Sequence, residues 1–273
     1  MEIELLWFVV TLCITGAIAG ITAGLFGNGG GFVVVPALLA VFPFFTPPSE
    51  ALVKVAIGTS LASIVVSSAR SVMAHRAKGA VDFDILRSWS IWLILGVGGG
   101  VIIANNTSAN GLTVVFAAGV LLYSVYFLFP EFVVRPGLVF DMPTGLGKAV
   151  LAFVLGGFSA LLGIGGGTPT VITMVMCQRS IQQAVATAAG VGFLIGLPGA
   201  LGFLFMKHPE SASLPFGTVG FINIPALIAI SIGAIFTAPI GAQMAHNFSE
   251  KKLKRLFGVY LVIVSSAMFY KAM

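Results

Sequence analysis

Two glycine-rich segments carry the residues best suited to bind a ligand. One is AGLFGNGGGFVVVP from Ala23 to Pro36, and the other is ALLGIGGGTPTVIT from Ala160 to Thr173. Glycine adopts backbone angles that expose several N–H groups together, and the short helix predicted after each segment adds unpaired amides and partial positive charge. The two segments therefore predict a pair of cradles for an anion.

The same glycines also have a purely structural interpretation, because small residues let membrane helices pack closely. Two matched three-glycine tracts, each placed before a short helix, favour the binding site. Nucleotide binding is excluded, since a phosphate loop needs Gly-Lys-Ser or Gly-Lys-Thr and a dinucleotide fingerprint needs a preceding strand. The residues expected to donate hydrogen bonds to the anion are Asn28, Gly29, Gly30, Gly31, Gly165, Gly166, Gly167 and Thr168.

A row of hydroxyl side chains that ends in a cation lies on one face of the helix predicted from Ala51. Ser60, Ser63, Ser67 and Arg70 have the spacing of a helical stripe. They could line a polar route for an anion, with Arg70 attracting it at the entrance. Serines in membrane helices also bond their own backbone carbonyls, and an arginine often flanks a span, so both interpretations stay open.

Further side chains are assigned to the site by their positions along the chain. Thr59, Ser60 and Thr187 are expected to complete it with hydroxyl groups. Phe26 and Phe32 flank the first glycine tract, and they are expected to wall off an organic part of the substrate or to act as a gate.

The titratable and sulfur-containing residues argue against other chemistry. The acidic residues lie at the chain ends, in predicted loops or at helix edges, whereas cation carriers place carboxylates within their spans. His75, His208 and His246 are likewise assigned to loops, which disfavours a buried histidine relay. Cys13 and Cys177 lack metal or redox spacing and are expected to be small core residues. No catalytic triad or metal site can be assembled, so we expect neither an enzyme nor a cofactor.

The composition defines the class of protein. Of 273 residues, 58% are apolar and 8% are charged, and the mean hydropathy is +1.07. A soluble domain carries roughly a quarter charged residues, so the chain is expected to be an all-α polytopic membrane protein. The net charge of +5 comes from Lys and Arg in short gaps between apolar runs, which excludes nucleic acid as a partner. The expected partners are a small anionic substrate and the lipid bilayer, with a homodimer left open.

Apolar runs between turn residues predict ten helices. Two of them, the second and the seventh, are shorter than the roughly 17 residues that a span needs, so they are predicted to be partial helices. The predicted helices are Leu5–Phe26, Phe32–Phe45, Ala51–Ala74, Ile85–Ala104, Gly111–Phe129, Leu146–Leu162, Pro169–Cys177, Ile181–Met206, Val219–Ala242 and Leu253–Tyr270.

The chain is predicted to contain two five-helix repeats. They occupy residues 1–130 and 149–273, joined by a polar linker at 131–148, and the GNGGG of the first recurs as GIGGG in the second. Two gaps, 70–87 and 250–255, are the richest in Lys and Arg and are expected to face the cytoplasm. An even number of crossings then separates them, so the second repeat is inverted and both chain ends face away from the cytoplasm. Inverted repeats are typical of secondary transporters.

These motifs resemble the TauE/SafE family of membrane permeases, often described as sulfite exporters and carriers of sulfur-containing organic anions. The resemblance rests on GLFGNGGGFVVVPALL from Gly24, AIGTSLASI from Ala56 and LLGIGGGTPTVITMV from Leu161, and it covers essentially the whole chain. It implies a substrate such as sulfite or a sulfonate and a place in a bacterial inner membrane. Asn28 departs from the Gly-Ile-Gly-Gly-Gly form and could donate a hydrogen bond directly, so the two cradles need not bind equally.

Together, these observations predict a secondary transporter that exports small sulfur-containing anions by alternating access around the two glycine tracts. Two alternatives stay open. An anion channel would need no alternation, and a membrane scaffold or assembly protein would use the glycines only for helix packing.

Overall fold

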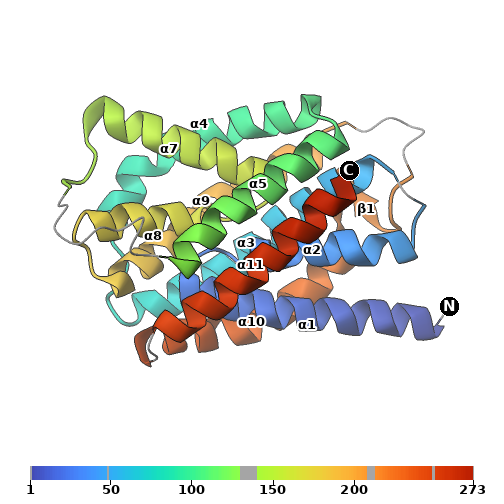
Figure 1. The fold of residues 1–273 in the computed structure, drawn as a ribbon, viewed down its shortest axis with the longest axis horizontal. Helices are drawn as coiled ribbons and strands as arrows, with labels where there is room; N and C mark the ends of the chain where they lie inside the picture. Colours follow the sequence, from blue (N-terminus) through green and yellow to red (C-terminus); the bar gives the residue numbers. More distant parts are fainter. Residues whose placement is uncertain (1, 48, 130–139, 208–212, 248–249, 273) are drawn as a thin grey trace.

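The structure, a computed structural model, describes residues 2–47, 49–129, 140–207, 213–247 and 250–272 (Figure 1). Eight helices in these residues are long and apolar enough to cross a membrane, which confirms the predicted polytopic helical fold. The elements are α1 (Glu2–Phe26), α2 (Gly31–Val41), η1 (Phe42–Phe44), α3 (Ala51–Arg76), α4 (Phe83–Asn106), α5 (Ala109–Leu128), α7 (Gly145–Leu162), α8 (Gly167–Met176), α9 (Ile181–Phe205), β1 (Thr218–Val219), β2 (Ile222–Asn223), α10 (Ile224–Asn247) and α11 (Glu250–Ala272).

The helix bounds agree with the sequence-based prediction to within a few residues, and the largest difference is at α10, which begins and ends about five residues later than predicted. The predicted helix start at Val219 is wrong, because Val219 belongs to a short antiparallel hairpin of β1 and β2. The Asn223 side chain accepts a hydrogen bond from the Ala226 N–H at 3.0 Å and so caps the start of α10. Helix α7 begins at Gly145, one residue before the predicted start, and positions 131–139 of the predicted linker lie outside the described residues.

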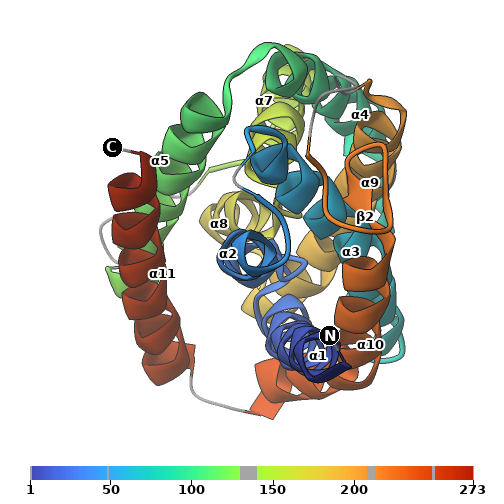
Figure 2. The same cartoon turned by 90° about the vertical axis from the view of Figure 1, so that its right-hand side faces the viewer.

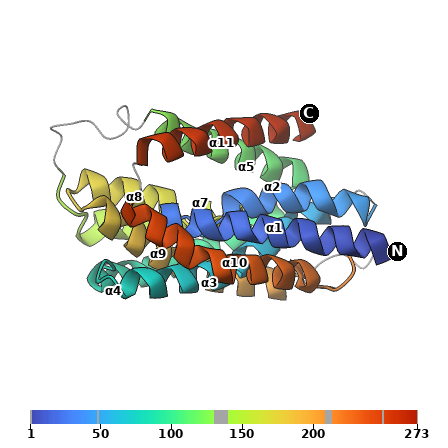
Figure 3. The ribbon, with the colours of Figure 1, turned by 90° about the horizontal axis from the view of Figure 1, so that it is seen from below.

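Helices α1 and α2 form a hairpin that enters and leaves at the same end of the bundle. We call them the first hairpin, and residues 27–30 between them the first break. The ring of Phe8, near the start of α1, lies 4.9 Å from the ring of Phe45, just after η1, so the chain has returned to the level at which it entered. Figure 3 shows α2 running back beside α1.

Helices α7 and α8 form an equivalent second hairpin, with the second break at residues 163–166. The N–H of Phe140, shortly before α7, donates to the carbonyl of Met176 at the end of α8, at 3.4 Å. This hairpin therefore also returns to the end from which it came. The two short helices predicted from the sequence thus fold back from the breaks instead of completing separate crossings.

The two hairpins enter the bundle from opposite ends. Both chain ends lie at the end of the bundle where the first hairpin begins, whereas α3 and α10 finish at the other end (Figures 1 and 3). The rings of His75, in the last turn of α3, and His246, in the last turn of α10, have centroids 5.5 Å apart, which brings the two basic gaps together. That the basic end faces the cytoplasm stays a prediction.

The two halves of the chain pack in equivalent ways, because each main contact between two helices recurs between their counterparts in the other half. Helix α1 packs along α10, and its counterpart α7 packs along α4, while α3 packs against α9 and α5 against α11. Figure 2 shows α2 and α8 in the middle of the bundle, with α5 and α11 together at one side. Such pairs are expected of two similar, oppositely oriented halves, although the residue bounds of the repeats stay a prediction.

Small residues bring the paired helices into close contact. On α4, Gly96 faces the backbone of α7, where a Cβ added to it would meet the Phe153 carbonyl oxygen. On α1, a Cβ at Gly16 would likewise meet the Ile230 carbonyl oxygen of α10. By contrast, Gly98 is exposed, and a Cβ there would meet nothing within 4 Å. Close backbone approach at small residues is a main source of helix association in membranes.

We predict that Gly96→Ala lowers the stability of the protein by about 1–3 kcal/mol, because the added methyl group has no space between α4 and α7. Gly98→Ala is the matched control on the same helix, and it should leave the melting temperature unchanged or slightly higher. Thermal unfolding of the purified variants in detergent measures the difference. Equal melting temperatures would contradict the close packing.

Candidate anion site between the two glycine breaks

The structure brings the two glycine tracts into direct contact at the centre of the bundle. The Gly165 N–H donates to the Asn28 carbonyl at 3.3 Å, which joins the two breaks. Gly167, the first residue of α8, lies against the Gly27 carbonyl, and Gly31, the first residue of α2, lies against the Gly163 carbonyl. Both short helices therefore begin at this contact, so the partial positive charges of their N-termini meet there.

The backbone at the breaks requires glycine at its turning points. Gly30 and Gly166 are the N-cap residues of α2 and α8, with φ of 82° and 63°, in the left-handed region. Gly27 and Gly163, where α1 and α7 end, have φ of 67° and 64°. A side chain would be strained at these positions, so the repetition of glycine in the sequence reflects a backbone geometry used twice.

Helix α3 donates hydrogen bonds to backbone carbonyls of the breaks, where the regular helical hydrogen bonds are interrupted. The Ser60 hydroxyl donates to the Gly163 carbonyl at 2.7 Å, and the Ser67 hydroxyl donates to the Gly29 carbonyl at 2.9 Å. Ser63 bonds only the Ser60 carbonyl of its own helix, at 2.8 Å. In this structure the three serines are buried, and Ser60 and Ser67 hold the breaks in place. That the hydroxyl row lines a route for the anion stays a prediction.

Four unpartnered polar side chains surround the contact between the breaks. In the described residues, five buried side-chain nitrogen or oxygen atoms have no hydrogen-bond partner, and four of them belong to Asn28, Ser68, Ser159 and Thr168. The fifth belongs to Ser231 of α10. A buried donor without a partner costs roughly 1–3 kcal/mol, so four in one place point to a ligand that accepts hydrogen bonds.

Each of the four side chains can donate a hydrogen bond. The Asn28 oxygen accepts from the Gly30 N–H at 3.0 Å, which leaves its amide nitrogen to donate. Thr168 follows the second break directly, and the Ser159 hydroxyl lies 3.0 Å from where a Cβ on Gly166 would be. The Ser68 hydroxyl lies 3.3 Å from the corresponding point on Gly29. Donors from both hairpins and from α3 thus converge on the breaks.

Comparison with known proteins identifies the family. The model of the sulfite exporter TauE/SafE family matches residues 12–268. The chain belongs to the TauE/SafE family. It is 28% identical to a probable membrane transporter protein of Haemophilus influenzae, over 97% of this chain and 99% of that one. It is 27% identical to a probable membrane transporter protein of Methanocaldococcus jannaschii, over 97% of this chain and 96% of the other.

A third relative is the probable membrane transporter protein YunE of Bacillus subtilis, which is 26% identical over 96% of this chain and 97% of its own length. No solved structure matches the chain significantly. The family and these relatives confirm that the protein is a multi-pass membrane transporter and not an enzyme.

Arg70 and Thr59, both predicted to belong to the site or its entrance, make contacts elsewhere in this TauE/SafE protein. The Arg70 Nε donates to the Ile235 carbonyl of α10 at 3.4 Å. The Thr59 hydroxyl oxygen accepts the Asn223 N–H at 2.9 Å, so it holds the β hairpin against α3. The structure does not bring these two side chains to the contact between the breaks, and their role in transport stays a prediction.

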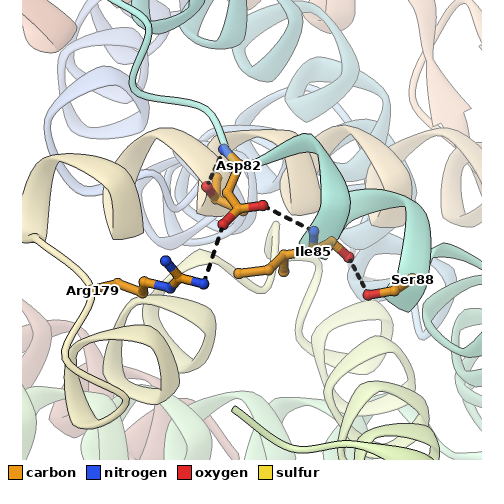
Figure 4. A network of polar contacts seen from close by, with 5 residues as sticks. Asp82, Ile85, Ser88 and Arg179 are labelled. Carbon is orange, nitrogen blue, oxygen red and sulfur yellow. Dashed lines mark hydrogen bonds and ion pairs between the residues drawn. The ribbon is translucent and has the colours of Figure 1, made fainter. Parts of the chain in front are cut away.

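The Thr187 hydroxyl makes its hydrogen bond at the start of α4. Its oxygen accepts the Asp82 N–H at 3.0 Å. Figure 4 shows the Asp82 carboxylate accepting the Ile85 N–H and lying near Arg179, with distances of 3.1 and 3.9 Å. Thr187 thus connects α9 to the N-cap of α4, and the structure does not direct its hydroxyl toward the breaks.

Phe26 and Phe32 face away from α3, toward the pair formed by α5 and α11. Phe26 stacks on Phe257 with ring centroids 4.9 Å apart, and Phe32 meets Tyr123 edge to face at 5.4 Å. A groove of about 610 Å³ beside them, between α1, α2 and α11, has an almost entirely apolar lining that includes Phe26 and Tyr260. The role of the two phenylalanines as wall or gate stays a prediction.

The histidine prediction is corrected by the structure. His75 is fully buried in the last turn of α3 and His246 lies in the last turn of α10, so neither is in a loop. His208 lies outside the described residues. The predicted helix stopped at Ala74, whereas α3 continues to Arg76, because the apolar pattern fades before the hydrogen-bonded helix ends.

The two cysteines are half-buried and unbridged. Cys177 lies at the end of α8, where burial and the nearby Asp141 carboxylate raise the pKa of its thiol. A raised pKa keeps the thiol protonated and unreactive. This fits a packing role for Cys177, although at a helix end instead of within a span.

We predict that Ser60→Ala and Ser67→Ala each lower stability by about 1–3 kcal/mol, because each leaves a buried carbonyl of a break without a donor. Ser63→Ala is the control, since that hydroxyl bonds a carbonyl of its own helix and its loss should be nearly neutral. Thermal unfolding in detergent compares the three variants. If Ser63→Ala were as destabilising as the other two, the support of the breaks by α3 would be contradicted.

Proposed function

We propose that the protein is a secondary transporter that exports small sulfur-containing oxyanions, such as sulfite or organosulfonates, from the cytoplasm across a bacterial inner membrane. The observation that carries the proposal is the set of four unpartnered donors at the meeting point of two helix N-termini. The family description, which names sulfite export, supports the choice of substrate.

The chemistry of the site suits an oxyanion. A sulfite or sulfonate group has three oxygens that only accept hydrogen bonds, and the unpartnered donors of Asn28, Ser68, Ser159 and Thr168 come from both hairpins and from α3. The N-termini of α2 and α8 add partial positive charge in a medium of low dielectric constant, where it acts strongly. A cation would find fewer acceptors, because the amide nitrogen and the helix N-termini present only N–H groups.

The two hairpins supply a way to alternate access. They enter from opposite ends, and their tips meet at the site, so each hairpin separates the site from one end of the protein. Asn28 and Thr168 are at most 2% exposed, which makes this a closed conformation. Movement of one hairpin would open the site to its own end while the other stays shut.

Closure at both ends favours a carrier over an anion channel, and unpartnered donors favour a ligand site over a scaffold that only packs helices. Under the positive-inside rule the basic end faces the cytoplasm, and both chain ends face away from it. The membrane potential then drives a negative charge outward by about 2.3 kcal/mol per charge per 100 mV.

We predict that Thr168→Val separates binding from stability. It removes an unpartnered buried hydroxyl at nearly constant shape, so the melting temperature without anion should stay the same or rise. The extra stabilisation by a bound anion should fall, because one donor is lost. Melting curves with sulfite, sulfate, ethanesulfonate, acetate and chloride measure both quantities.

Thr170→Val is the matched control on the same helix. The Thr170 hydroxyl donates to the Gly166 carbonyl of its own helix at 2.9 Å, and the Thr170 N–H bonds the same carbonyl, so loss of the hydroxyl should change the melting temperature little while the shift caused by the anion remains. Absence of stabilisation by every anion would contradict the carrier and favour a scaffold. Anion flux in liposomes that neither saturates nor shows counterflow would identify a channel.

A further inference from the structure

A buried histidine pair connects the first hairpin to the basic end of the protein. The Nε2 of His75, on α3, lies 3.0 Å from the Gly24 carbonyl in the last turn of α1, just before the first break. The Nδ1 of the same ring lies 3.3 Å from the Nε2 of His246 on α10. His75 is fully buried, whereas His246 is partly exposed at the end of its helix.

The contacts determine where the protons are. A carbonyl only accepts, so the Nε2 of His75 carries a hydrogen, and in the neutral ring the Nδ1 is then an acceptor. That Nδ1 receives the Nε2 hydrogen of His246. The Nδ1 of His246 is left as the position at which an additional proton can bind from solvent.

The pair can pass that proton inward without any change of fold. A proton binds at Nδ1 of His246, and the Nε2 proton of His246 then moves to Nδ1 of His75. The result is a positively charged His75 that still donates to Gly24, beside the carbonyl end of α1, where a cation is favoured. One proton enters and one positive charge appears next to the first break.

Burial of His75, together with the positive charges around the pair, makes a charge on the pair costly unless an anion is present. Lys78, in the turn after α3, acts on both rings, and Arg70 and Arg76 lie on the same helix, with Arg76 turned outward over the Phe83 ring. The last turn of α1 carries no titratable residue, and α10 offers only His246 in its last turn. These surroundings are positive, so an anion between the breaks would supply the compensating charge.

We propose that His75 and His246 form a proton-binding site linked to the anion site, so that anion binding strengthens as the pH falls at the basic end of the protein. The proposal rests on the proposed function, because it needs an anion between the breaks. Linkage is reciprocal, so the anion must also promote uptake of a proton.

The size of the effect follows from geometry. Ser68 and His75 are seven residues apart on α3, which corresponds to about 10 Å along a helix. Two opposite charges at that distance, with an effective dielectric constant of about 20, strengthen binding by roughly tenfold.

The test compares the wild type with His75→Gln, whose amide can still donate to the Gly24 carbonyl but cannot take a proton. The dissociation constants of ethanesulfonate, sulfate and sulfite are measured at steps from about pH 7.5 down to about pH 4. For the wild type we expect roughly tenfold tighter binding at the lowest pH, and for His75→Gln no such difference. Comparing the two proteins with the same anion cancels any change in ionisation of the anion itself.

Calorimetry in buffers of different ionisation enthalpy measures protons taken up on binding, and it should show greater uptake by the wild type than by His75→Gln. Ser71→Ala controls for disturbance of α3, since Ser71 contacts the Ala23 carbonyl one turn away, and this variant should keep the pH dependence. Equal pH dependence in the wild type and His75→Gln would overturn the proposal.

Two further outcomes are separable. If neither protein binds any anion at any pH, the proposed function itself fails. If His75→Gln does not fold, His246→Ala replaces it: the protonated His75 loses the charge-assisted hydrogen bond from its Nδ1 to His246, so the pH dependence should move to lower pH than in the wild type, and an unchanged profile would overturn the proposal.

Discussion

A helix interrupted in the middle of a bilayer leaves N–H and C=O groups that no water or lipid can satisfy, and the rest of this protein is arranged around that constraint. Two such interruptions lie side by side, and α3 provides hydroxyl groups to both, through Ser60 and Ser67. Helix α3 is the most buried of the eight spanning helices in the described residues, since 83% of its most apolar 18-residue segment is buried. Its serines are therefore best understood as the support of the breaks.

The contact between the two breaks also constrains how the outer helices pack against the hairpins. Tips that meet in the centre require the hairpins to lie close to their neighbours, and the glycine contacts of α1 with α10 and of α4 with α7 allow this. The pair α5 and α11 is joined differently, through aromatic rings around Phe257. One side of the bundle is thus held by close backbone contact and the other by large side chains, with an apolar groove between α11 and the first hairpin.

Much of the fold could be predicted from the sequence, because span length, apolar composition and glycine tracts are local properties. The positions of the breaks and the presence of Asn28 and Thr168 beside them follow from such patterns. The hydrogen-bond partners of the hydroxyl groups do not follow from local patterns. Thr187 and Thr59 look like site residues in the sequence, but each accepts an N–H from a distant segment. Ser68 and Ser159 were not predicted, because only the tertiary arrangement shows that they lack partners.

The two hairpins resemble each other in backbone, yet α3 holds them unequally. It bonds the first through Ser67, Ser71 and His75, and the second through Ser60. Separating the second hairpin from α3 therefore breaks fewer of these bonds than separating the first. Two conformations that differ in this way are unequally populated, so a duplicated architecture need not give a symmetric cycle. In the proposed alternating-access cycle, the empty protein would therefore populate the conformation open toward the basic end more than the one open toward the other end.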